Sequence, residues 1–221
     1  IISASSNPGD VVLDPFCGCG TTVAAAQKLD RQWIGIDITH LAIGLMRQRL
    51  RDMFGDAAKF KVIGEPTTAE DAAALADADP YQFQWWALGL VGARPADQKK
   101  GADQGIDGRL FFHDDPRADA KQIIFSVKAG KVQSAYVRDL IGVLGREHAQ
   151  IGVLISLNEP TRPMREEAAS VGFYTSPWDG HTYPRVQLVT VAELLDGRSI
   201  QYPASRHTNV THQRAPRAKA D

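Results

Sequence analysis

The amino-acid sequence predicts an α/β fold in two units. Short apolar, β-branched runs alternate with helix-favouring segments along the chain. The length of 221 residues corresponds to about one and a half domains of roughly 150 residues. The composition also changes over residues 65–80, which are acidic and rich in alanine. We therefore predict a first unit at 1–64, a linker with a short helix at 65–80, a second unit at 81–202 and a flexible basic tail at 203–221.

The first unit combines strands, a glycine loop and helices. The pair Pro8-Gly9 predicts a turn before the first apolar run, and the loop Cys17–Gly20 follows that run. Thr21 or Thr22 is expected to cap the next helix through its hydroxyl group. In order, we expect a strand at 11–13, a helix at 23–29, a strand at 33–36, a helix at 40–54 and a third strand at 60–63.

The second unit shows the same alternation with longer apolar strands. Its first segment is rich in large apolar side chains, which indicates a buried helix. Gly172 is expected to close a later helix at its C-terminus. In order, we expect a helix at 81–91, strands at 109–112 and 123–127, a helix at 136–148, a strand at 152–157, a helix at 163–171, a strand at 186–189 and a helix at 191–195.

Composition and cysteine usage exclude several classes of protein. The formal net charge of −1 excludes a strongly basic, histone-like protein, although a local basic face remains compatible with it. Cys17 and Cys19 are too close for an ordinary disulfide and too few for a structural zinc site. We therefore expect a reduced, cytoplasmic protein. The sequence has no apolar run of about 18 residues and no signal-peptide pattern, so no membrane association is expected.

The glycine loop is the first candidate site. Gly18 and Gly20 lie between a predicted strand and a predicted helix, where backbone N–H groups bind anionic ligands. Asp37 ends the next strand, 17 residues beyond Gly20, and an acid in that place binds ribose hydroxyls. A third glycine is absent because position 23 is Val, which argues against a nicotinamide or flavin cofactor. A Rossmann-like turn for some other ligand is the alternative.

These residues resemble a known family. The run Asn7-Pro8-Gly9-Asp10-Val11-Val12-Leu13-Asp14-Pro15-Phe16-Cys17-Gly18-Cys19-Gly20-Thr21-Thr22, with Arg31-Gln32-Trp33-Ile34-Gly35-Ile36-Asp37 after it, is similar to the S-adenosylmethionine motifs of DNA amino-methyltransferases. The resemblance covers about 55 residues and implies methylation of adenine N6 or cytosine N4. It implies that Asp14, Phe16, Gly18 and Gly20 line the methionine end of the cofactor, with Thr21 beside them, and that Asp37 binds the ribose.

The same family carries a second motif that this sequence lacks. The catalytic tetrapeptide, (Asp/Asn/Ser)-Pro-Pro-(Tyr/Phe/Trp), holds the target amino group, whereas Asp79-Pro80-Tyr81 has only one proline. The chain also begins at Ile1 and not at Met. We therefore expect a fragment that holds the last strands of a Rossmann-like methyltransferase domain without its catalytic half.

The second candidate site joins Asp107 and Lys128. Asp107 comes just before one predicted strand and Lys128 just after the next, so the two side chains can converge on one site. Carboxylates hold Mg²⁺, and a lysine stabilises the charge that develops in phosphodiester cleavage. The alternative is that Asp107 is a turn residue beside Gly105 and Gly108 and that Lys128 is an exposed strand-end lysine.

This segment resembles the Mrr-like branch of the PD-(D/E)xK nucleases. The residues that carry the likeness are Gly101-Ala102-Asp103-Gln104-Gly105-Ile106-Asp107-Gly108 and the strand Ile123–Lys128. The resemblance implies a restriction-endonuclease-like domain with a mixed sheet, in which Asp107 binds Mg²⁺ and Lys128 is catalytic. Ser126 replaces the middle glutamate or glutamine of the motif, and Gln84 replaces the acid that many members have in the first helix. Both changes remove negative charge, so we expect a weaker metal site.

We therefore predict a protein of DNA modification. S-adenosylmethionine is the expected cofactor and DNA the expected partner, and the activity of this chain alone is left open because the catalytic motif is missing. The alternatives are a Mg²⁺-dependent DNA endonuclease and a non-catalytic DNA-binding remnant of that fold. The sequence does not indicate the recognition site, the methylated base or the oligomeric state.

Overall fold

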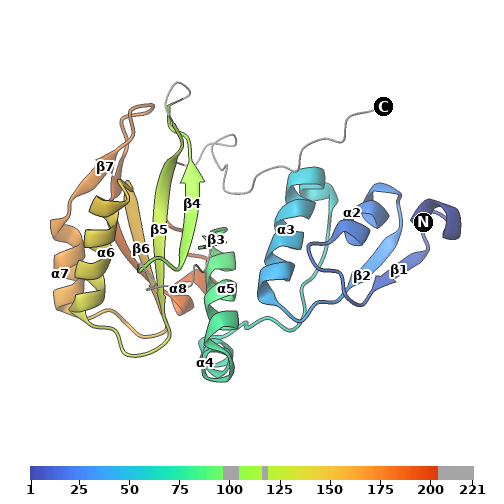
Figure 1. Cartoon of the computed structure of the whole chain (residues 1–221), viewed down its shortest axis with the longest axis horizontal. Helices are drawn as coiled ribbons and strands as arrows, with labels where there is room; N and C mark the ends of the chain where they lie inside the picture. Colours follow the sequence, from blue (N-terminus) through green and yellow to red (C-terminus); the bar gives the residue numbers. More distant parts are fainter. Residues whose placement is uncertain (97–104, 116–118, 204–221) are drawn as a thin grey trace. The chain divides into compact units, whose positions relative to one another are not determined.

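The computed structural model describes residues 1–96, 105–115 and 119–203. The chain divides into two compact units, Ile1–Pro66 and Thr67–Asp221, which are described separately (Figure 1). The first unit holds a two-stranded parallel sheet and the second a five-stranded sheet with both strand directions. The predicted α/β class with a mixed sheet is confirmed. Within the described ranges, no helix is long and apolar enough to span a membrane.

The first unit is a strand–helix–strand–helix arrangement. The parallel strands pair in the register Val11↔Gln32 to Asp14↔Gly35, because the helix between them returns the chain to the same edge. Its elements are α1 (Ile2–Ser5), β1 (Val11–Asp14), α2 (Thr21–Lys28), β2 (Gln32–Gly35), α3 (His40–Phe54) and the 3₁₀ helix η1 (Gly55–Ala57).

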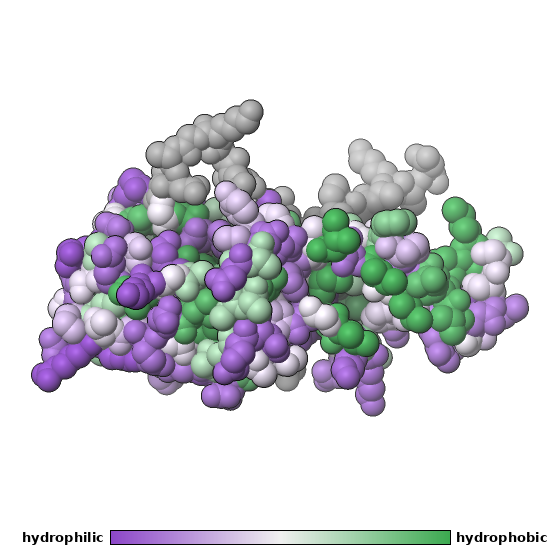
Figure 2. All heavy atoms as spheres, turned by 90° about the horizontal axis from the view of Figure 1, so that it is seen from below, coloured by the Kyte–Doolittle hydropathy of each residue, from purple (hydrophilic) through white to green (hydrophobic). Residues whose placement is uncertain are grey.

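One face of the β1–β2 sheet is apolar and exposed. The four side chains that alternate onto this face are more than half exposed, and they are Val11, Leu13, Ile34 and Ile36. Figure 2 shows apolar side chains gathered over this unit. Strands with apolar side chains on both faces are typical of parallel sheets that are covered on both sides. The first unit therefore has the features of part of a larger sheet.

Two local predictions for the first unit are wrong. Residues 60–63 form no strand, because Phe60 packs its ring against Trp33, with ring centroids 6.1 Å apart, in place of a backbone ladder. Neither Thr21 nor Thr22 caps α2. The N-cap is Gly20, in the left-handed conformation at φ 77°, and no side chain bonds there. The Thr21 hydroxyl instead accepts a hydrogen bond from Arg49.

The second unit is built on the sheet β3-β4-β5-β6-β9. Strands β3, β4 and β5 are antiparallel, whereas β5, β6 and β9 are parallel. Its elements are α4 (Ala69–Ala78), α5 (Pro80–Leu90), β3 (Arg94–Pro95), β4 (Gly108–Phe112), β5 (Lys121–Lys128), α6 (Ser134–Arg146), β6 (Ile151–Ser156), α7 (Arg162–Ser170), β7 (Phe173–Thr175), β8 (Thr182–Pro184), β9 (Val186–Thr190) and α8 (Val191–Leu195).

Helices cover both faces of this sheet. On β5, Ile123 and Phe125 pack with α4, α5 and α8, whereas Ile124 packs with α6 and α7, as the alternation of side chains along a strand requires. Figure 1 shows α6 and α7 on one side of the sheet and α5 on the other. Strands β5 and β6 therefore lie in the core of the unit. They support the β4–β5 pair, which carries the residues of the predicted nuclease motif.

Helix α4 lies inside the segment that was predicted as a linker. Its Ala72 and Ala76 are buried in the core of the second unit. A capping box starts the helix, because Thr68 and Asp71 exchange hydrogen bonds between side chain and backbone. The predicted short helix is therefore present, and its contacts place it in the second unit. Most of the predicted tail, residues 204–221, lies outside the described residues.

Candidate functional site

The glycine loop joins the end of β1 to the start of α2. Asp14 turns the chain, because its Oδ1 accepts a hydrogen bond from the Phe16 N–H at 3.2 Å. Gly18 and Gly20 both have positive φ, at 49° and 77°, a conformation that favours glycine. A Cβ atom on Gly20 would lie 2.5 Å from Met46 Cγ, whereas a Cβ on Gly18 would meet open space. Gly20 therefore packs against α3, and Gly18 leaves its backbone open.

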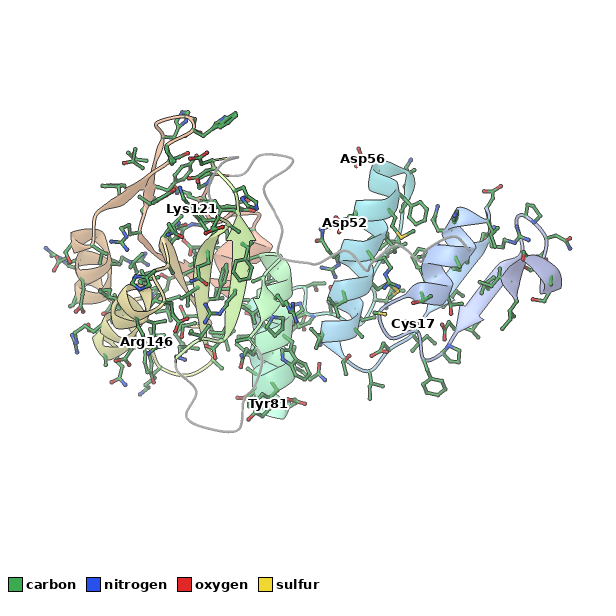
Figure 3. All side chains as sticks on the ribbon, turned by 45° about the horizontal axis from the view of Figure 1, so that its top comes forward. Cys17, Asp52, Asp56, Tyr81, Lys121 and Arg146 are labelled. Carbon is green, nitrogen blue, oxygen red and sulfur yellow. The ribbon has the colours of Figure 1, made fainter. Side chains whose placement is uncertain are left out.

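Cys17 fixes the loop to the adjacent strand. Its N–H donates to the Ile36 carbonyl at 2.9 Å, and its side chain is buried. Figure 3 labels it at the same end of the first unit as the start of α3. Burial, and then the charges of Asp37 and Asp14, raise the pKa of its thiol. Cys17 is therefore a packed thiol and not a reactive one.

Asp37 closes the loop from the end of β2. Its Oδ2 accepts the Gly18 N–H at 3.0 Å, and its Oδ1 accepts the Thr39 N–H and hydroxyl, both at 2.9 Å. The hydrogen bond from the Thr39 backbone is the largest cause of a lowered pKa for Asp37. The carboxylate is therefore ionised at neutral pH, and its remaining lone-pair positions can accept ribose hydroxyls.

The donor set fits S-adenosylmethionine. The first turn of α2 has no side-chain cap and no acidic residue, so its N–H groups are free to bind the methionine carboxylate. The Asp37 carboxylate suits the ribose. The structure brings Gly18 and Asp37 into direct contact and puts Thr21 first in α2. Phe16, by contrast, extends its ring into solvent, with 87% of the residue exposed.

Asp107 and Lys128 meet at one end of the β4–β5 pair. Asp107 Oδ2 accepts the Val127 N–H at 2.6 Å and lies 3.5 Å from Lys128 Nζ. The backbone of Asp107 also pairs with β5, through its N–H to the Phe125 carbonyl at 2.9 Å. Lys128 Nζ lies 5.5 Å from the centre of the Tyr136 ring. The two predicted residues are therefore together, as a closed ion pair.

The other two residues of the predicted nuclease motif, Gln84 and Ser126, supply no carboxylate to the site. Gln84, on α5, donates its amide to the backbone carbonyl of Asp107 at 3.4 Å. Ser126 is only 5% exposed. In the described part of the chain, no group of three or more His, Cys, Asp or Glu residues could hold a metal ion. These residues do not fit Mg²⁺, which prefers several carboxylate and water oxygens.

A polar cluster that the sequence did not reveal lies at the other end of β4 and β5. Tyr174, on β7, donates its hydroxyl to Asp114, and Lys121 Nζ lies 2.6 Å from Asp114 Oδ1 and 2.6 Å from the Tyr174 hydroxyl. Figure 3 labels Lys121 in this region. Desolvation, and then the hydrogen bond to Asp114, raise the pKa of Tyr174. The cluster ties β7 to the β4–β5 hairpin.

Comparisons with known proteins match separate families to the first and to the second unit of the chain. A family model described as DNA methylase matches residues 1–46. The type II methyltransferase M.EcaI of Enterobacter cloacae is 55% identical over 49 residues, which are 22% of this chain and 11% of that protein. M.BamHI of Bacillus amyloliquefaciens is 48% identical over 52 residues, 24% of this chain and 12% of that protein.

A third relative matches over a similar length. The DNA adenine methyltransferase YhdJ of Escherichia coli (strain K12) is 55% identical over 49 residues, which are 21% of this chain and 17% of that protein. The chain thus spans less than a fifth of the length of these curated relatives. The predicted resemblance of the first unit to DNA amino-methyltransferases is confirmed.

Two further comparisons concern restriction endonucleases. Among solved structures, the DNA modification-dependent restriction endonuclease AspBHI aligns with a TM-score of 0.43 and 20% identity, over 62% of this chain and 38% of that one. A family model described as NACHT-associated inactive Restriction Endonuclease 1 matches residues 81–196. Because that match covers more than half of the 221 residues, the chain belongs to the family of NACHT-associated inactive Restriction Endonuclease 1.

Proposed function

We propose that the first unit binds S-adenosylmethionine and that the protein it represents methylates an exocyclic amino group of adenine or cytosine in DNA. The observation that carries the proposal is the Asp37 carboxylate, held on the Gly18 N–H at the uncapped start of α2. When bound, the cofactor supplies an activated methyl group. The chain's own residues bind and orient it, through the N–H groups of α2 and the carboxylate of Asp37.

The similarity to type II methyltransferases supports DNA as the partner. It covers only the cofactor motifs, and the sequence contains no Pro-Pro tetrapeptide of the catalytic type. We therefore propose that this chain alone binds the cofactor without methylating DNA. A cytoplasmic location, expected from the two unpaired cysteines, belongs to the same proposal.

Calorimetric titration of the chain with S-adenosylmethionine tests the cofactor site. We expect saturable binding that Asp37→Ala removes or weakens by about tenfold or more, because a charged hydrogen-bond partner of the ribose is lost. Asp56→Ala is the matched control, since Asp56 is an exposed carboxylate at the opposite end of α3 from Cys17 (Figure 3). Absence of binding, or binding that Asp37→Ala leaves unchanged, contradicts the proposal.

For the second unit, we propose that it binds DNA without cleaving it. Asp107 is already bonded to Val127 and Lys128, and within the described ranges it belongs to no group of three or more His, Cys, Asp or Glu residues that could hold a metal ion. We therefore expect no metal-dependent cleavage by this unit. Binding of duplex DNA that weakens with salt, without cleavage when Mg²⁺ is added, is the expected result. Cleavage that requires Lys128 would instead favour the endonuclease alternative.

A further inference from the structure

Arg49, on α3, reaches the start of α2 and has no acidic partner among the residues that the structure describes. Its guanidinium donates to the Thr21 hydroxyl at 2.8 Å. Thr21 is the first residue of α2, so the guanidinium reaches this helix start across 28 positions of sequence. In the described ranges, Arg49 forms no ion pair, whereas Arg47 on the same helix pairs with Glu65. Most of the donors of Arg49 are therefore available to a ligand.

Two positive groups meet at the start of α2, the helix N-terminus and the Arg49 guanidinium. The N-terminus of a helix carries a partial positive charge, which favours acids and disfavours cations. Two other helices of the chain follow this rule, because α4 has Asp71 and α8 has Glu193 in a capping box. Helix α2, like α6 and α7, has no acid in its first turn and no side-chain cap. At α2 the Arg49 guanidinium is in addition bonded to the first residue of the helix. Two positive groups at one place are stabilised when an anion joins them.

We propose that Arg49 positions the carboxylate of the methionine moiety of S-adenosylmethionine at the N-terminus of α2. This inference rests on the proposed cofactor site and adds to it a residue outside the glycine motif. The hydrogen bond from Arg49 to Thr21 orients the guanidinium beside the free N–H groups of the helix. The planar fork of an arginine matches a carboxylate in a way that a lysine ammonium does not. Arg49 therefore acts as a positioning residue and contributes to cofactor affinity.

A pair of ligands that differ only in the carboxylate tests this role. We would titrate the full chain with S-adenosylhomocysteine and with its decarboxylated analogue, and repeat both titrations with Arg49→Ala and Arg49→Lys. The wild-type chain is expected to bind S-adenosylhomocysteine about tenfold more tightly than the analogue, the scale of one hydrogen-bonded charge. Arg49→Ala should remove that preference by weakening only the ligand with the carboxylate. Arg49→Lys should keep part of it, because the charge remains.

Arg51→Ala is the matched control for the loss of an arginine. Arg51 is exposed on the same helix, two residues further on, and its replacement should leave the preference between the ligands unchanged. Equal weakening of both ligands by Arg49→Ala and Arg49→Lys, or no weakening, overturns the assignment while the cofactor site stands. Failure of the wild-type chain to bind either ligand overturns the cofactor site itself.

Discussion

Lys128 Nζ lies 3.5 Å from Asp107 Oδ2, and the same carboxylate oxygen accepts the Val127 N–H at 2.6 Å. The two residues that the nuclease resemblance assigns to catalysis are thus partners of each other. The ammonium group of Lys128 lies beside this carboxylate, and its positive charge disfavours a second cation there. At this end of the β4–β5 pair the two residues form an ion pair, and the described residues offer no metal-binding group of three or more.

The first prediction is that Asp107 contributes more than Lys128 to the free energy of unfolding. Asp107→Ala leaves the buried Val127 N–H without its acceptor, so we expect the free energy of unfolding to fall by about 1–3 kcal/mol. Lys128→Met removes only a partly exposed ion pair, with side chains 30% and 18% exposed, so we expect a loss of about 1 kcal/mol or less. Urea unfolding followed by circular dichroism measures both. A larger loss for Lys128→Met would show that the ammonium group holds the site.

The second prediction concerns magnesium. A ligand that binds only the folded state raises the unfolding temperature, and the described residues offer no metal-binding group of three or more. We therefore expect the unfolding temperature of the second unit to be the same with and without millimolar Mg²⁺. The measurement is differential scanning calorimetry of the wild-type chain and of Asp107→Ala. Stabilisation by Mg²⁺ that Asp107→Ala abolishes would restore the metal site.

The sequence predicted the long core elements and missed the short ones. Strands β5, β6 and β9 are continuous apolar runs that are buried on both faces, so their local pattern is sufficient to identify them. The two- and three-residue strands β3, β7 and β8 depend on their pairing partners and carry no local pattern. Conversely, Phe60 begins a β-branched run, but its ring is used to pack against Trp33.

The contacts in the candidate sites also differ in whether a local sequence pattern predicts them. The spacing of Gly18 and Asp37 is that of a strand–loop–helix–strand unit. The sequence therefore predicts that the two residues lie close together, and they are hydrogen-bonded in the structure. The contact of Arg49 with Thr21 depends on how α3 packs beside α2, which no local motif encodes. The bonds from Tyr174 and Lys121 to Asp114 likewise join β7 to the β4–β5 hairpin, 60 positions apart for Tyr174.

The third prediction concerns stability at alkaline pH. The pKa of Tyr174 is raised in the folded chain by burial and by Asp114, whereas an unfolded tyrosine titrates near pH 10. The stabilisation from Tyr174 is therefore fully present below about pH 10 and is lost as the pH rises toward the folded pKa. We expect Tyr174→Phe to lower stability at neutral pH and to flatten its decline between about pH 9 and pH 11. Urea midpoints across this range measure the effect.

Tyr81→Phe is the matched control for this series. Tyr81 is exposed at the start of α5 (Figure 3), so its replacement should leave the alkaline decline unchanged. Burial also raises the pKa of Tyr183 and Tyr202, and some decline should therefore persist in Tyr174→Phe. An unchanged slope in Tyr174→Phe would mean that the hydroxyl does not distinguish the folded chain from the unfolded one.

The fourth prediction separates Gly18 and Gly20, the two glycines of the glycine loop. Both have positive φ, so an alanine at either position is strained by roughly 1–2 kcal/mol. Only at Gly20 would the new Cβ also meet Met46, at 2.5 Å from Cγ. We therefore expect Gly20→Ala to destabilise the first unit more than Gly18→Ala, as measured by thermal unfolding. Met46 is a flexible side chain. Met46→Ala in the Gly20→Ala background should relieve the clash with the new Cβ and leave the backbone strain in place. Additive losses in the double variant would contradict this, since residues in contact are expected to couple.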